Sequence, residues 1–461
     1  MAEPEFPIAE LNALESEAAA AKEEVIAPVS PRSRWATAVR ALRHRNFQLF
    51  FAGQLISLIG TWMQTVALSW LVYRISGSTL LLGTVGFASQ IPVFLMAPLG
   101  GVVADRANRR RVVIATQTLA MVLAFILAAL TLTHRIQVWQ IMVLAAALGT
   151  VYAFDIPARQ AFLMDMVGRE DLMNAIALNS SMFNGARIVG PAVAGIVVAW
   201  VGEGWCFFAN AVSYIAVIVG LLMMRIQHPV KVVIEGSPLE HILEGFRFVA
   251  KAMPLRSILL LLGLVSLVGM PYMVLMPVFA SQILHGGAKE LGWLMGATGV
   301  GALMGALSLT TRVGVKGLGK LIAMCAAGFG ASLILFAASK MFWLSLLLLL
   351  PVGFTMMCQM ASSNTLLQSM VPDQMRGRVV SLYTMMFMGV APFGAFFAGA
   401  VAHRIGAPWT VAIGGIACIA GAAAFSMFLP EFRAEARQLV RAQGIVAAAA
   451  TAEDEARPGI R

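Results

Sequence analysis

Charged residues are scarce in this 461-residue chain. Asp, Glu, Lys and Arg make up 12% of it, whereas an ordinary soluble domain carries roughly 25%. Of its 23 acidic residues, seven lie before position 46 and five lie after Phe428, which leaves eleven for the long central region. Hydrophobic residues account for 59% of the chain. This balance excludes an ordinary soluble domain and indicates an integral membrane protein.

The sequence also lacks the patterns of several chemical sites. Its four cysteines have no spacing typical of a disulfide framework or a metal site, so we expect free buried thiols. There is no HExxH, no GxSxG and no GxxxxGK[ST] phosphate loop. We therefore expect no metal, no cofactor, no enzymatic activity and no built-in ATPase. The net charge of +10 is spread over short loops, which argues against nucleic-acid binding.

What the chain does contain is long apolar runs, each near the 20 residues that a helix needs to cross a membrane. Twelve such runs predict about 12 transmembrane helices in an all-α integral membrane protein. They cover 47–73, 79–104, 111–132, 137–158, 172–201, 205–225, 256–284, 290–311, 317–338, 341–365, 378–402 and 407–429.

Basic residues in the short loops predict the orientation. With the N-terminus in the cytoplasm, eleven Arg and Lys residues fall in inner loops and five fall in outer loops. Because cytoplasmic loops are enriched in Lys and Arg, both termini are expected to be cytoplasmic. The expected location is the inner membrane of a bacterium.

The longest internal connection divides the runs six and six. Within it, apolar residues recur at helical spacing between Leu239 and Val249, which predicts an amphipathic helix at the inner interface or a platform for a partner protein. Residues 167–199 also align without a gap with 371–403, so the fifth and eleventh runs are counterparts. We expect two pseudo-symmetric six-helix bundles, a plan typical of transporters. The predicted parts are a tail (1–45), a bundle (46–225), a linker (226–255), a second bundle (256–429) and a tail (430–461).

The loop after the second run reads GVVADRANRRRVV, residues 101–113. It resembles the signature loop of the major facilitator superfamily, with Asn108 where that family usually has glycine. Asn tolerates left-handed backbone geometry, so a tight turn is expected to survive there. We expect Gly101 to allow close helix packing, and Asp105 to pair with Arg109 or Arg110 and to meet a helix N-terminus, so that the loop acts as a conformational gate. A basic loop that only sets orientation is the alternative. The expected gate residues of this loop are Gly101, Asp105, Arg106, Arg109 and Arg110.

Further motifs narrow the resemblance. DIPARQAF (155–162), GARIVGPAVAG (185–195), SNTLLQSMVPDQMRGRVVSLY (363–383) and GVAPFGAFFAG (389–399) are similar to the bacterial exporter branch that contains the enterobactin exporter and macrolide efflux proteins. The GPAVAG segment is similar to a fifth-helix motif of exporters that exchange substrate for protons. The resemblance implies proton antiport. Gly185, Gly190, Pro191 and Gly195 are expected to make a bendable, closely packed helix, with packing alone as the alternative.

Two charges lie inside apolar runs. Arg187 lies deep in the fifth run, where a cation is costly, so we expect it to bind an anionic substrate group, to balance a coupling acid or to have a structural partner. Asp155 lies near the inner end of the fourth run, roughly 15–20 Å from Arg187 along the membrane normal by helix rise. A direct pair between them is not expected. Asp155 is expected to pair with Arg159 or with a basic loop residue at an inner gate, with proton carrying as a weaker alternative.

Polar uncharged residues complete the candidate site. Gln54, Ser57, Thr61 and Gln64 recur at three- and four-residue steps, which places them on one face of the first helix. We expect that face to line a central cavity, with hydrogen bonding between helices as the alternative. Asn364, Gln368 and Tyr383 are candidates from the tenth and eleventh helices. Methionines such as Met270, Met273 and Met276 are expected mainly to pack.

The expected function is that of a secondary active transporter, a monomer that exports a small molecule by alternating access. The coupling ion implied by the family is the proton, although Asp155 is the only carboxylate clearly inside a run. A siderophore-like anion would suit Arg187, whereas a drug would suit the apolar surroundings. The competing hypothesis is a non-transporting membrane sensor or scaffold on a transporter fold.

Overall fold

The computed structural model describes residues 40–225, 238–310, 312, 314–436 and 439, and every regular element among them is helical. Eleven helices are long and apolar enough to cross a membrane, which confirms an all-α integral membrane protein. Five belong to the N-terminal half, and a short η1 (Arg40–Arg43) precedes them. They are α3 (Arg45–Ser76), α4 (Thr79–Arg106), α5 (Arg109–Leu132), α6 (Val138–Val201) and α7 (Glu203–Met223).

The 64-residue helix α6 accounts for two of the twelve predicted spans. A continuous helix of that length would extend about 96 Å, three times the thickness of a hydrocarbon core. Gly168 interrupts it with φ 74° and ψ 179°, a backbone conformation that favours glycine. The chain reverses there, so α6 supplies the fourth and fifth spans. The predicted runs 137–158 and 172–201 are therefore too short at their facing ends, because helix continues up to Gly168 on both sides.

The C-terminal half begins with α8 (Pro238–Lys251), the amphipathic helix expected in the linker, while residues 226–237 lie outside the described residues. Its first crossing is built from four pieces: α9 (Met253–Leu264), η2 (Val265–Gly269), α10 (Tyr272–Val278) and η3 (Phe279–Ile283). Both η2 and η3 are π-helical, and Pro271 and Pro277 lie beside them. A uniform span was expected over 256–284, so this irregularity was missed. Missing proline N–H groups and wide π turns both disturb helix geometry.

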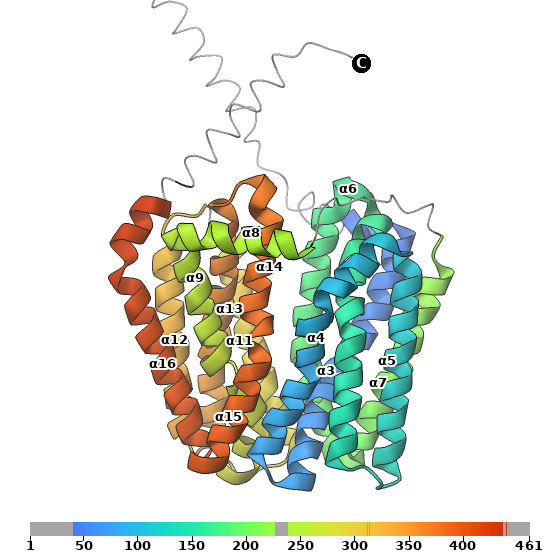
Figure 1. Cartoon of the computed structure of the whole chain (residues 1–461). Coiled ribbons are helices and arrows are strands. Elements are labelled where there is room, and N and C mark those ends of the chain that lie inside the picture. The colour runs from blue at the N-terminus through green and yellow to red at the C-terminus, as the bar shows by residue number, and fades with distance from the viewer. Residues whose placement is uncertain (1–39, 226–237, 311, 313, 437–438, 440–461) are drawn as a thin grey trace, which may run out of the picture.

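The remaining crossings follow the expected order. They are α11 (Ala288–Thr310), α12 (Leu318–Ala338), α13 (Phe342–Ser369), the joined α14 (Asp373–Thr384), η4 (Met385–Gly389) and α15 (Ala391–Ile405), and finally α16 (Ala407–Met427). Figure 1 shows two side-by-side bundles, with α8 lying across one end of the C-terminal half. Glu244 of α8 forms an ion pair with Arg378 of α14, which fixes α8 to that half.

The two halves meet through two matching glycine contacts. A Cβ added to Gly195 of α6 would lie 3.1 Å from the Cα of Gly292 of α11, and one added to Gly399 of α15 would lie 2.8 Å from the Cα of Gly83 of α4. Gly195 and Gly399 are equivalent in the expected internal repeat, and the same crossing is made twice. Such close backbone approach is possible because glycine has no side chain.

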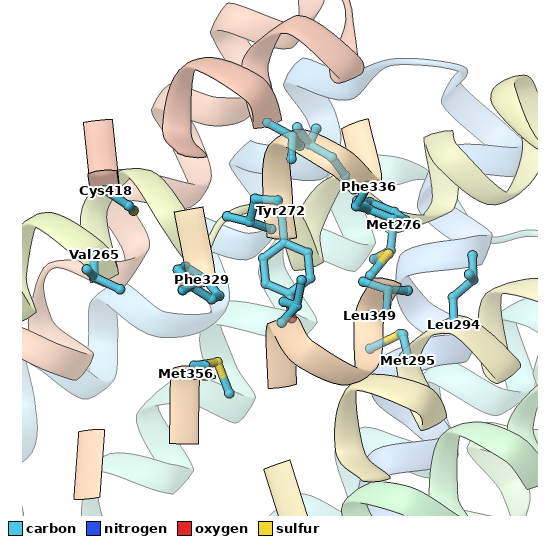
Figure 2. Packing of buried hydrophobic residues seen from close by; sticks show 14 of the residues in the cluster. Val265, Tyr272, Met276, Leu294, Met295, Phe329, Phe336, Leu349, Met356 and Cys418 are labelled. Atoms are coloured by element: carbon cyan, nitrogen blue, oxygen red, sulfur yellow. The ribbon is translucent and has the colours of Figure 1, made fainter. Parts of the chain in front are cut away.

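The C-terminal half has a dense aromatic and methionine core, shown in Figure 2. Tyr272 meets Phe329 edge to face with ring centroids 6.1 Å apart, and Phe279 lies 4.6 Å from Phe336. Met276 is 1% exposed within the same cluster, so it packs as expected. The four cysteines are buried and free, as expected, although Cys325 of α12 and Cys358 of α13 interact through their side chains.

Candidate transport pathway

Arg187 lies in α6 where that helix crosses α11 of the other half. A Cβ added to Gly299 of α11 would lie 3.1 Å from the Arg187 carbonyl oxygen. Tyr272 of α10 is near enough to influence the charge of the guanidinium. Its Nη2 atom is buried without a hydrogen-bond partner, and no carboxylate among the described residues pairs with it. The Arg187 side chain therefore has an unused N–H donor, which can bind an anionic group or another hydrogen-bond acceptor.

Asp155 is a buried acidic residue in the first half of α6, with an exposed fraction of 1%. Its Oδ1 accepts hydrogen bonds from Thr116 (2.8 Å) and from Gln117 (2.9 Å) of α5. Its Oδ2 lies 3.2 Å from Nη2 of Arg159, one helical turn later. The expected pair with Arg159 is confirmed, and Asp155 forms no ion pair with Arg187. Asp155 therefore joins the first half of α6 to α5.

The signature loop joins helices of the N-terminal half to one another. Arg109 forms an ion pair with Asp165 of α6 at 2.9 Å, and its Nε donates to the Ala104 carbonyl. Arg110 donates to two carbonyls at the end of α7, at 2.8 and 2.9 Å. Asp105 is exposed and forms no ion pair or hydrogen bond with either arginine. The expected pairing of Asp105 is therefore wrong in this conformation, because Asp165 and backbone oxygens occupy both guanidinium groups.

Two other local expectations for this loop are also wrong. A Cβ added to Gly101 would have no neighbouring atom within 4 Å, whereas a Cβ added to Gly100 would collide with the Ala153 carbonyl of α6. The glycine that allows close packing is therefore Gly100. Asn108 has φ −69° rather than a left-handed conformation, and its side chain accepts from the Arg111 N–H as the N-cap of α5. Arg106 is exposed beside it.

Close packing along the second half of α6 is confirmed at two of its glycines. A Cβ at Gly190 would lie 3.0 Å from the Ile59 carbonyl of α3, and Gly195 contacts α11 as described above. The Pro191 carbonyl is directed at Gly292. Gly185 has nothing within 4 Å of the added Cβ, so it takes no part in this packing.

The polar face of α3 lies largely inside the N-terminal half. Gln54 and Gln64 are 3% and 6% exposed, and the Gln64 side chain accepts a hydrogen bond from Asn210 of α7 at 2.8 Å. The expectation of a cavity-lining role is wrong for Gln64, because hydrogen bonding between helices satisfies it. Thr61 is half-buried and donates to the Ser57 carbonyl of its own helix.

The candidates from the C-terminal half are brought together in two pairs. Gln368 donates to Asn364 at 3.0 Å, and both are half-buried on α13. The Tyr383 hydroxyl of α14 donates to the Met360 carbonyl of α13 at 3.0 Å. The Tyr383 hydroxyl therefore links α14 to α13.

Several buried polar residues escaped the sequence reasoning. Tyr152 of α6 and Tyr214 of α7 have hydroxyls 3.4 Å apart, and Tyr152 interacts electrostatically with Asp155. On α13, Ser362 and Ser363 are buried with hydroxyl groups that have no partner in the described part of the chain. The adjacent serines one turn after Gln359 could have suggested a polar face. No residue spacing connects Thr116 or Gln117 to Asp155, because they come from another helix.

Comparison with known proteins now adds to this geometry. The chain matches the transmembrane secretion effector family over residues 36–452. It belongs to this family, within the major facilitator superfamily. It is 25% identical to the staphyloferrin A transporter of Staphylococcus aureus, over 80% of this chain and 93% of that protein. It is 28% identical to the multidrug efflux pump Tap of Mycolicibacterium fortuitum (75% and 87%), and 26% identical to the enterobactin exporter EntS of Shigella boydii (74% and 81%).

Solved structures resemble the fold of this secretion-effector protein. A nucleoside transporter, NupG (D323A mutant), has a TM-score of 0.66 at 14% identity, covering 83% of this chain and 99% of that one. An inward-facing bacterial homologue of ferroportin has a TM-score of 0.61 at 17% identity, covering 82% and 98%. Together with the family match, these likenesses confirm the expected multi-pass membrane fold.

Proposed function

We propose that this protein exports an anionic small molecule across the inner membrane of a bacterium, and that Arg187 binds the anionic group. The observation that supports this most is the buried Nη2 of Arg187, which has neither a hydrogen bond nor a described carboxylate. An unpaired charge inside a membrane protein has a high free-energy cost, so such a charge is expected where a bound ligand pairs with it. Two relatives are named for staphyloferrin A and enterobactin, which favours a siderophore-like substrate.

We further propose that both termini are cytoplasmic, so that the α8 end faces the cytoplasm and the two glycine contacts lie near the outside. The ribbons of the halves meet at the end opposite α8 and stand apart at the α8 end (Figure 1). In the proposed orientation the glycine contacts join the halves near the outside, as a conformation that takes up substrate from the cytoplasm requires. A monomer is sufficient, since one chain supplies both halves of a transporter.

The test uses purified protein in liposomes loaded so that uptake of substrate reports export. We expect Arg187→Ala to abolish transport of an anionic siderophore and Arg187→Lys, the charge-retaining control, to preserve part of it. Transport of a cationic dye should not depend on Arg187 in this way. Equal siderophore transport by Arg187→Ala would contradict the role of this residue. Absence of any transport by the wild-type protein under all gradients would instead favour the sensor or scaffold hypothesis.

We also propose that Asp155 carries the exchanged proton. Its Oδ2 lies beside Arg159 while Oδ1 accepts two hydrogen bonds, so protonation would release Arg159 and loosen the contact with α5. We expect substrate-dependent proton movement, followed with a pH-sensitive dye in the liposomes, to disappear in Asp155→Asn. Asp105→Asn, which changes an exposed carboxylate, is the control. Unchanged proton movement in Asp155→Asn would remove Asp155 from the coupling path.

The multidrug pump among the relatives favours a second candidate, an apolar drug held without an essential charge. The buried methionine and aromatic cluster around Tyr272 is consistent with it, although that cluster is packed. A deletion strain separates the two candidates, because loss of siderophore secretion indicates the first and increased drug sensitivity indicates the second.

A further inference from the structure

A groove lies between α9 and α16 in the C-terminal half. Figure 1 shows α16 at the edge of the molecule away from the N-terminal half. It has a volume of about 470 Å³. Leu260 and Phe428 line it and are 63% and 52% exposed, although both belong to segments at the membrane. Exposed apolar side chains on the outer surface of a membrane helix face lipid. The wall of the groove therefore suits a hydrocarbon chain.

Opposite charges lie at one end of this apolar groove. Arg256 in the first turn of α9 and Glu431 just after α16 both line it, and both are exposed. Neither forms an ion pair with another side chain in the described part of the protein. Leu264 lies eight residues beyond Arg256, about 12 Å deeper by helix rise. The charges therefore lie at the membrane surface on the α8 side and the apolar wall extends inward from them.

We propose that the groove binds one molecule of phosphatidylethanolamine. Its phosphate pairs with Arg256, its ammonium group donates hydrogen bonds to Glu431, and an acyl chain lies along Leu260 and Leu264. The Glu431 carboxylate determines which lipid headgroup fits the groove. A purely anionic headgroup would be repelled by Glu431, and a quaternary ammonium has no N–H to donate to it. This site is independent of the transport pathway around Arg187.

Native mass spectrometry of the full chain tests the groove itself, with phosphatidylethanolamine, phosphatidylglycerol and phosphatidylcholine of identical acyl chains as probes. We expect one phosphatidylethanolamine to bind in preference to the other two. Ala424 lines the groove and neighbouring Ala423 does not, while both are exposed on α16. Ala424→Phe should remove the bound lipid and Ala423→Phe should retain it. Equal retention by both variants would overturn the proposal.

The charged residues provide the second arm. We expect Arg256→Ala to weaken binding of phosphatidylethanolamine about fivefold, the effect of one basic residue near a membrane surface. Glu431→Gln should abolish the preference over phosphatidylglycerol and phosphatidylcholine. Lys320→Ala, which removes an exposed cation from α12 outside the groove, should leave binding unchanged. If wild-type protein binds the three lipids equally, or if Glu431→Gln keeps the preference, the assignment of the headgroup is wrong.

Discussion

Arg109 and Asp165 form an ion pair in which both side chains are largely buried, 12% and 10% exposed. Removing one partner of such a pair leaves an uncompensated charge in an environment of low polarity, which costs about 3–5 kcal/mol. We expect Arg109→Ala to lower the midpoint of thermal unfolding in detergent clearly. Arg106→Ala, at an exposed position of the same loop, should have a small effect. Similar midpoints for the two variants would show that the pair contributes little.

The charged residues also show which ion pairs can be predicted from the sequence. It identified the charged residues, because arginine and aspartate are conspicuous among apolar neighbours. It paired Asp155 with Arg159 correctly, since one helical turn separates them. It assigned Arg109 to Asp105 instead of Asp165, because the partner lies 56 positions away on another helix. Local spacing predicts partners within a helix, whereas partners between helices depend on packing.

At the scale of the element, α6 depends on where its glycines lie. Gly195 touches Gly292 of the other half, whereas Gly185 of the same helix has open space around it. We expect Gly195→Val to reduce export strongly, since its side chain would force the halves apart, and Gly185→Val to leave export nearly unchanged. Both substitutions add the same volume to the same helix, which makes them a matched pair. Export should be measured in the liposome assay at equal protein content, and equal activities would contradict the expected role of the contact.

The helices themselves were largely predictable, and their irregularities were not. Apolar runs located all the crossings, because a hydrocarbon core requires a minimum length of apolar helix. The sequence did not indicate that helix continues up to Gly168 on both sides. It also did not indicate the π-helical η2 and η3. Periodicity averages over many residues, so it does not reveal a single residue with unusual backbone angles.

At the scale of the whole molecule, the repeated glycine contacts imply a rocking motion of two similar bundles. We expect substrate to shift the population toward a form open at the opposite end. Spin labels at Thr133 and Lys340 should report an increase in distance between the ends where the halves now meet. Labels at Arg106 and Lys320 should report a decrease at the α8 end. All four positions are exposed, and distances that change with the same sign at both ends would contradict rocking.

The two-bundle plan was visible in the sequence because one segment is repeated within the chain. The glycine at position 195 has its counterpart at 399, and both make the same crossing. The candidate site was less predictable. Arg187 was selected for its depth, but its approach to Gly299 depends on two helices from different halves. No spacing rule within one segment encodes such a meeting point.

At the two glycine contacts the halves touch through backbone atoms, at Gly195 with Gly292 and at Gly83 with Gly399, and the Thr79 hydroxyl adds a hydrogen bond to the Gly399 carbonyl. Backbone atoms neither gain nor lose a proton in the ordinary range of acidity, and dissolved ions screen them little. In the proposed orientation these contacts lie next to the external medium. We therefore expect the backbone contacts themselves to be insensitive to acidity and salt, whereas the charged side chains beside the Gly195 contact, Arg74, Glu203, Lys289 and Glu290, respond to both.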